Sequence, residues 1–179
     1  MICRDQFEVW DPFPLERVFR FFANPENLPR IMPPVSGTRI DVLRLVEPSP
    51  SPSLVETDLL RTLAGVGSEI ATCFRILPPL PIRAQWVARV TEFEWNRYFA
   101  DIQVTGPFKS WHHRHEFEAE MRDGINGTVV RDRIEYEIGF GVVDTVAQKL
   151  FVERPMARTF AHRQRILEEL LRAEDRNAA

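Results

Sequence analysis

Five strand-like segments follow one another in the middle of this chain, at residues 68–77, 82–90, 97–104, 108–121 and 128–138. The second shows the pattern most clearly, because the apolar Ile82, Ala84 and Trp86 alternate with polar residues. Parallel strands would need crossovers of a dozen or more residues, usually helical, and only short turns join these segments. The stretch therefore predicts an antiparallel sheet in which each strand follows its neighbour.

Proline, glycine and asparagine mark the turns of this meander. Three of the four residues at 78–81 are prolines, and Gly106-Pro107 turns the chain again. Between the last two strands, both Asp123-Gly124 and Asn126-Gly127 are typical of hairpin turns, and we expect both to contribute to the connection.

Shorter elements precede the meander. Residues 4–10 alternate as a strand with Phe7 and Val9 on one face, and Pro14 suits the first position of a helix. That helix has apolar residues at helical spacing, namely Leu15, Val18, Phe19 and Phe22. A second helical piece is expected at 25–31, a strand at 38–46 and a loop at 47–53, whereas residues 54–64 fit either a short helix or a strand.

A long helix is predicted at the C-terminal end, over residues 144–174. Its apolar stripe consists of Val146, Leu150, Met156, Phe160, Leu167, Leu170 and Leu171. Pro155 interrupts the pattern, and an interior proline removes a backbone hydrogen bond, so we expect a kink or break at 151–154.

Composition limits the function classes. The 179 residues carry a formal net charge of −3, so the chain lacks the basic excess of a nucleic-acid-binding protein, and its length predicts one domain over residues 1–179. Cys3 and Cys73 cannot build a disulfide framework or a four-cysteine zinc site. No apolar run is long enough for a membrane span, and the polar N-terminal residues do not resemble a signal peptide. We therefore expect a cytoplasmic protein without a cofactor; the oligomeric state stays open.

The element order predicts an α+β fold. A strand, two short helices and an antiparallel run precede the C-terminal helix, whose stripe must be buried against the face of the sheet. A curved sheet wrapped around that helix leaves a concave space, which is the usual kind of site for a small molecule.

Four segments resemble the SRPBCC superfamily, which includes START-like proteins, polyketide cyclases and birch-pollen-type allergens. They are DPFPLERVFRFFANPENLPRIMP at 11–33, GPFKSWHHRHEFE at 106–118, GTVVRDRIEY at 127–136 and FAHRQRILEEL at 160–170. The segment at 47–66 and Pro155 depart from the family pattern. The resemblance implies a helix-grip fold whose cavity, between the sheet and the C-terminal helix, binds an apolar or amphipathic ligand. It implies no single reaction, because one fold hosts many functions.

Strand periodicity brings a polar group to the inner face. Side chains alternate, so His113 and His115 share a face with large apolar neighbours, and Asp132 lies on the inner face of the next strand. On the strand before, the pattern alone favours an inward set of Tyr98, Ala100, Ile102 and Val104, whereas the resemblance favours Phe99, Asp101 and Gln103. The expected ligand-binding residues are Phe74, Trp86, Phe99, Asp101, Gln103, Trp111, His113, His115, Asp132, Tyr136 and Phe160.

Three functions fit these residues. The first is a carrier or sensor of a hydrophobic or amphipathic small molecule, in which the polar group orients the ligand. The second is a cyclase, dehydratase or hydrolase with His113, His115 and Asp132 in acid–base roles. The third is a protein-interaction domain that displays apolar residues of the 47–66 segment, namely Leu54, Val55, Leu59 and Leu60. His113, His115 and Asp132 could also hold a metal, but the short His-x-His motif recurs by chance, so no metal is expected.

Overall fold

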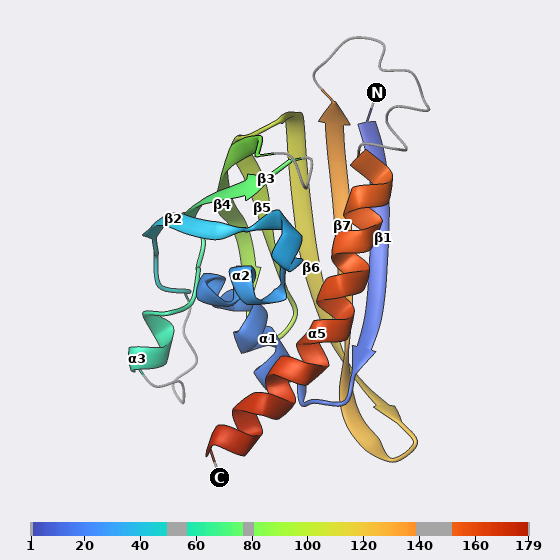
Figure 1. Ribbon diagram of the computed structural model, residues 1–179. Coiled ribbons are helices and arrows are strands. Elements are labelled where there is room, and N and C mark those ends of the chain that lie inside the picture. The colour runs from blue at the N-terminus through green and yellow to red at the C-terminus, as the bar shows by residue number, and fades with distance from the viewer. Residues whose placement is uncertain (1, 50–56, 77–80, 139–151, 179) are drawn as a thin grey trace.

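One seven-stranded antiparallel sheet organises the chain, in the order β1-β7-β6-β5-β4-β3-β2. The computed structural model describes residues 2–49, 57–76, 81–138 and 152–178. The strands are β1 (Ile2–Asp11), β2 (Arg39–Arg44), β3 (Glu69–Arg75), β4 (Arg83–Glu94), β5 (Tyr98–Thr105), β6 (Phe108–Arg122) and β7 (Ile125–Ile138). Figure 1 shows the sheet curving behind the long helix α5 (Arg154–Ala178). The predicted antiparallel sheet and helix-grip architecture are thus confirmed.

The β6–β7 hairpin turns at Asp123-Gly124, where both residues have positive φ, of 50° and 77°. A two-residue turn of this kind matches the twist of the flanking strands. The prediction that Asn126-Gly127 also turns the chain was wrong, because Asn126 pairs with Met121 inside the ladder. Gly127 has a packing role instead: a Cβ there would lie 2.4 Å from the ring of Trp10.

Short helices cover one end of the concave face. They are α1 (Leu15–Ala23), η1 (Pro25–Asn27), α2 (Leu28–Ile31) and η2 (Pro34–Ser36). Pro14 precedes α1, as expected, and the helix turns Val18, Phe19 and Phe21 into the core. Phe19 packs edge-on against the ring of Phe117 on β6, which fixes α1 to the sheet.

Helix α5 lies along β1 and β7 and reaches α1 at its C-terminal end (Figure 1). Its buried side chains include Met156, Phe160, Leu167 and Leu171, all members of the predicted stripe. Pro155 lies in its first turn, where a missing N–H is tolerated, and residues 152 and 153 wind as a π turn. The rest of the predicted 144–174 helix, with Val146 and Leu150, lies outside the described residues.

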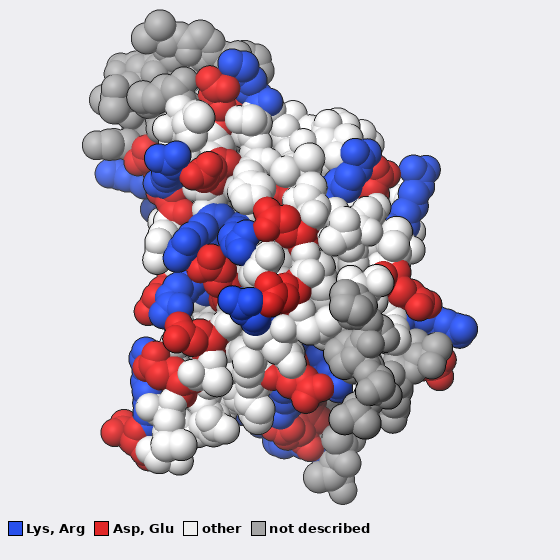
Figure 2. All heavy atoms as spheres, turned by 180° about the vertical axis from the view of Figure 1, so that it is seen from behind, with Lys and Arg blue, Asp and Glu red and all other residues white. Residues whose placement is uncertain are grey.

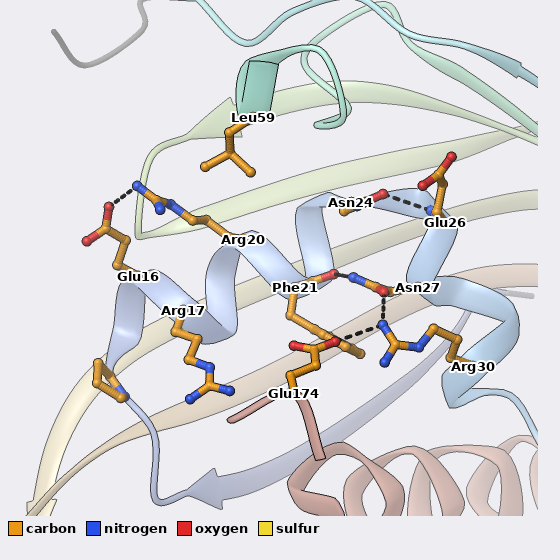
Figure 3. Close-up of a pocket in the computed structure, with 11 residues that line it drawn as sticks. Glu16, Arg17, Arg20, Phe21, Asn24, Glu26, Asn27, Arg30, Leu59 and Glu174 are labelled. Atoms are coloured by element: carbon orange, nitrogen blue, oxygen red, sulfur yellow. Dashed lines mark hydrogen bonds and ion pairs between the residues drawn. The ribbon is translucent and has the colours of Figure 1, made fainter. Parts of the chain in front are cut away.

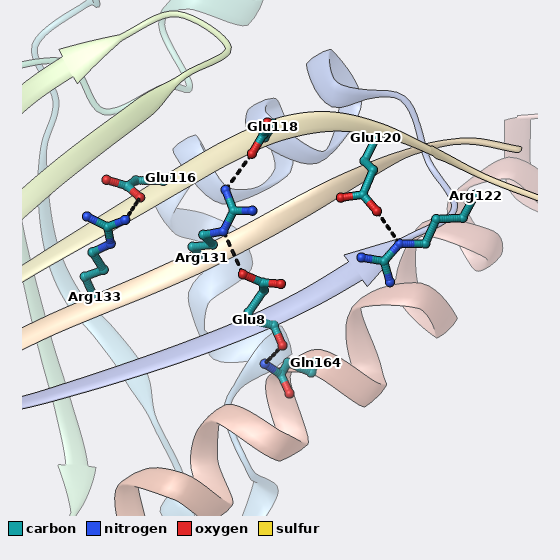
Figure 4. A network of polar contacts seen from close by, with 8 residues as sticks. All are labelled: Glu8, Glu116, Glu118, Glu120, Arg122, Arg131, Arg133 and Gln164. Carbon is teal, nitrogen blue, oxygen red and sulfur yellow. Dashed lines mark hydrogen bonds and ion pairs between the residues drawn. The ribbon is translucent and has the colours of Figure 1, made fainter.

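The convex face of the sheet carries paired charges. Arg131 lies 2.6 Å from Glu8 and 2.6 Å from Glu118, so it joins β7 to both neighbouring strands (Figure 4). From the concave side, Gln164 of α5 donates to the backbone carbonyl of Glu8 at 3.1 Å. Figure 2 shows acidic and basic side chains interspersed over the molecule seen from behind. This face is therefore solvated and locally balanced in charge.

The segment around α3 (Thr57–Leu60) contains two of the apolar residues expected on an interaction surface, Leu59 and Leu60. Leu60 is buried and so does not display an apolar surface; Leu59 is partly buried and packs against the core; Leu54 and Val55 lie outside the described residues. At the sheet edge, β2 contains a bulge between Ile40 and Val42. None of the helices in the described ranges has the length and apolarity needed to span a membrane.

Candidate functional site

A buried polar cluster forms where β5, β6 and β7 run side by side. The register pairs Asp101 with His113 and His115 with Asp132, and all four side chains point to the face that α5 covers. Phe99 also lies on this face, with its ring centroid 4.5 Å from that of His115. The inward set on β5 is therefore the one that the resemblance implies, and not the more apolar alternate set.

The carboxylate of Asp132 lies against both imidazoles. Its Oδ1 lies 3.0 Å from Nε2 of His113, which it hydrogen-bonds, and 2.6 Å from Nδ1 of His115. The two imidazole centroids are 3.9 Å apart, and Nε2 of His115 lies 4.0 Å from Oδ2 of Asp101. One carboxylate oxygen thus hydrogen-bonds His113 and lies beside Nδ1 of His115, while a second carboxylate approaches from the neighbouring strand.

Burial sets the charge state of this cluster. It lowers the pKa of His113 to about 4, with a further contribution from His115, and it also lowers the pKa of His115. Burial opposes ionisation of Asp132, but the charges of His115 and Arg163 and the hydrogen bond with His113 outweigh it and hold the pKa well below its usual value. Burial raises the pKa of Asp101. At neutral pH the centre is therefore an ionised Asp132 between two neutral imidazoles.

Arg163 also belongs to this site, although the sequence pattern did not predict it. It is 8 % exposed, lies on α5, and its charge acts on both Asp101 and Asp132. Its guanidinium lies 4.8 Å from the ring centroid of Phe160, and its Nε has no hydrogen-bond partner among the described residues. The spacing of the helix could have indicated its burial, because position 163 falls on the buried stripe between Phe160 and Leu167.

Aromatic side chains extend from the cluster across the sheet. Trp86 lies edge-on to Trp111 at 5.0 Å between centroids and contacts Phe74 at 6.3 Å and Phe108 at 5.9 Å. All four are only partly buried. Beside them, Tyr136 is fully buried with Met156 and Phe160, whose ring stacks on that of Phe7 at 4.3 Å.

Gln103 has a local structural role. Its Nε2 donates to the carbonyl of Phe108 at 2.7 Å, and its Oε1 accepts from the N–H of the same residue at 3.2 Å. Both ends of the amide therefore fasten the β5–β6 turn. Contact between this side chain and a ligand stays a prediction.

A hollow of about 560 Å³ lies beside α1, η1 and α2, at the C-terminal end of α5 (Figure 3). Its arginines are already neutralised by acidic neighbours: Arg20 pairs with Glu16, and Arg30 lies 2.8 Å from Glu174. A second hollow, of about 340 Å³, is lined by Ile102 and His112, and also by three residues of the predicted ligand-binding set, Gln103, Trp111 and Tyr136. Neither hollow is lined by the buried cluster.

Comparison with known proteins identifies the family. The family model described as "Polyketide cyclase / dehydrase and lipid transport" matches residues 11–165. No curated protein matches the chain significantly.

Three solved structures share the fold. Protein TTHA0849 of Thermus thermophilus is 17 % identical, with a TM-score of 0.64 over 96 % of this chain and 99 % of that one. A START superfamily protein of Mycobacterium smegmatis is 13 % identical, with a TM-score of 0.64 over 95 % and 97 %. Ara h 8.0201 is 11 % identical, with a TM-score of 0.56 over 92 % and 96 %. The chain therefore belongs to the polyketide cyclase / dehydrase and lipid transport family of the SRPBCC superfamily.

Proposed function

We propose that this protein binds a hydrophobic or amphipathic small molecule, such as a lipid or a polyaromatic compound, between the concave face of the sheet and α5. It would act as a cytoplasmic carrier or sensor. The family and the helix-grip fold are consistent with a ligand-binding domain. The ligand-contacting residues in this proposal are the aromatic and polar side chains expected from the sequence.

The observation that carries the proposal is the partly buried aromatic row on the concave face. Phe108 and Trp111 pack on the cluster around Tyr136, but Phe74 and Trp86 belong to none of the buried core clusters formed by the described residues. Large apolar side chains left partly exposed on a concave surface favour an apolar ligand, because covering them removes that surface from water.

The polar cluster next to this row supports an amphipathic ligand. Trp111 is two residues from His113 on the same face, with 6.0 Å between ring centroids. A molecule that covered Trp86 and Trp111 would therefore place one end near His113 and Arg163, where hydrogen-bond donors are available. This arrangement matches small-molecule sites, in which few polar groups orient a mostly apolar ligand.

Ligand extraction and a fluorescent probe test this function. Native mass spectrometry of the purified protein should show a bound mass that organic solvent removes, and cis-parinaric acid should bind the emptied protein. Trp86→Ala should weaken probe binding by about tenfold or more, since burying such a ring contributes about 1.5–3 kcal/mol. Trp10→Ala is the matched control, because Trp10 lies beside Gly127 and donates to the carbonyl of Glu120, away from the aromatic row. Absence of probe uptake by the unmodified protein would contradict the proposal.

A second candidate function is acid–base catalysis, favoured by the ionised Asp132 between two neutral imidazoles. A carboxylate that stays ionised next to imidazoles that stay neutral is an arrangement used in proton transfer. For a hydrolase, p-nitrophenyl acyl esters are a direct probe. Turnover should disappear in His113→Ala and Asp132→Asn while the circular dichroism spectrum is retained, and unchanged turnover in both would remove these residues from any catalytic role.

A further inference from the structure

The buried cluster contains a set of metal-binding atoms that involves Asp101 instead of Asp132. One ligand atom each from Asp101, His113 and His115 lies within 4.8 Å of the others. These residues occupy adjacent positions of the β5–β6 ladder, where Asp101 pairs with His113 and Phe99 pairs with His115. The sheet backbone thus fixes all three Cα positions before any ion arrives.

Asp132 has the position of a second carboxylate that orients ligands. Imidazoles that bind metals almost always donate the N–H of the other ring nitrogen to a carboxylate, a carbonyl or water, which fixes the tautomer and the ring orientation. Here Oδ1 of Asp132 lies 3.0 Å from Nε2 of His113 and 2.6 Å from Nδ1 of His115. Nε2 of His115 is not the nitrogen that lies beside Asp132, and it already faces Oδ2 of Asp101 at 4.0 Å, so it is placed to bind an ion.

The remaining geometry requires only a small contraction. A tetrahedral ion with ligand distances of about 2.1 Å separates its ligand atoms by about 3.4 Å. In the structure the three ligand atoms lie up to 4.8 Å apart. Small side-chain rotations supply about the displacement needed to reach the shorter separation. The charges also suit a cation: two carboxylates, Asp101 and Asp132, face one guanidinium, that of Arg163.

We propose that Asp101, His113 and His115 bind one divalent transition-metal ion of the Zn²⁺, Co²⁺ or Fe²⁺ class, and that Asp132 positions both imidazoles. Two nitrogen ligands and one oxygen ligand suit these ions better than Mg²⁺ or Ca²⁺, which prefer oxygen. Three protein ligands leave a coordination position open, and the partly buried aromatic row begins two residues away, at Trp111. The metal site does not depend on the small-molecule function proposed above.

Calorimetric titration of tag-free, chelator-treated protein with ZnCl₂ tests the site. The unmodified protein should bind one ion per chain, and CoCl₂ should give visible d–d absorption bands. Asp101→Ala and His115→Ala should abolish this binding. Asp132→Asn should weaken it by about 10- to 100-fold, the usual effect of removing a carboxylate that orients a metal-binding imidazole.

His112→Ala is the matched control. His112 is a neighbour of His113 on β6, but its side chain is 39 % exposed and lies 3.8 Å from Glu92 on β4. This variant should keep one bound ion and the same cobalt spectrum. Circular dichroism melts of every variant identify any that fail to fold.

Two results would overturn the proposal. One is the absence of stoichiometric zinc binding and of cobalt bands in the unmodified protein, which needs no variant. The other is unchanged binding in a folded His115→Ala variant, or a loss of binding in His112→Ala that matches it. Neither result bears on cis-parinaric acid uptake, so failure of the metal site and failure of the ligand-binding function are distinguishable.

Discussion

Replacing Asp11 by asparagine should stabilise the protein above neutral pH. Asp11 is 2 % exposed at the end of β1, and its Oδ2 has no hydrogen-bond partner among the described residues. Burial raises the pKa of this carboxyl to about 7, and the charge of Glu168 adds to the effect. The native state must therefore either keep Asp11 protonated or bury a poorly solvated charge.

The size of the effect follows from the pKa. The ordinary value is 3.8 and the folded value is about 7, and each pKa unit equals about 1.36 kcal/mol, so the penalty approaches about 4 kcal/mol above pH 7. Between about pH 4 and pH 7 the native state holds a proton that the unfolded state has released. The free energy of unfolding therefore falls as pH rises through this window and then levels off. Asparagine removes this contribution, although its buried amide also needs partners.

Urea denaturation followed by circular dichroism at pH 5, 6, 7 and 8 measures the difference. The stability of Asp11→Asn relative to the unmodified protein should increase steadily from pH 5 to pH 7 and then stay constant. Asp58→Asn is the control, because the side chain of Asp58 is 96 % exposed. Parallel stability curves for Asp11→Asn and the unmodified protein would refute the assignment of a raised pKa to Asp11.

Two packing predictions can be checked by the same denaturation assay at one pH. Phe160→Ala should lower the free energy of unfolding by about 3–5 kcal/mol, because the ring is 4 % exposed and stacks on Phe7; a loss below about 1 kcal/mol would mean that α5 does not depend on this contact. Gly127→Ala should cost about 1–3 kcal/mol, since its Cβ would lie 2.4 Å from the Trp10 ring and 2.6 Å from the Asp11 carbonyl oxygen. An unchanged denaturation midpoint would show that β1 moves away freely at this position.

The sheet could be predicted from local patterns because strand alternation and turn residues act over short distances. The inward direction of His113 and His115 followed from the same alternation, and α5 buries the stripe that its spacing predicts. Which face of β5 points inward did not follow from the pattern. Ala100 is buried as well as Phe99, so both faces of that strand carry buried residues. Only the family resemblance favoured Phe99 and Asp101.

Contacts between distant segments escaped prediction for a physical reason. Arginine is rarely buried, so Arg163 was not counted in the stripe although its spacing from Phe160 fits. Its charge acts on Asp101 and Asp132, which lie far away in sequence. The role of Gly127 likewise depends on Trp10, a residue on another strand, and no rule about hairpin turns contains that information.

One of the two edge strands, β2, has a consequence for how molecules of this protein meet in solution. Arg39, Asp41 and Arg44 are exposed along it, and the bulge between Ile40 and Val42 interrupts its regular spacing. A strand from another copy that added itself here would have to desolvate these ionic groups and follow an irregular ladder. Such an addition is disfavoured, so the β2 edge of the sheet is protected against growth into larger β-assemblies.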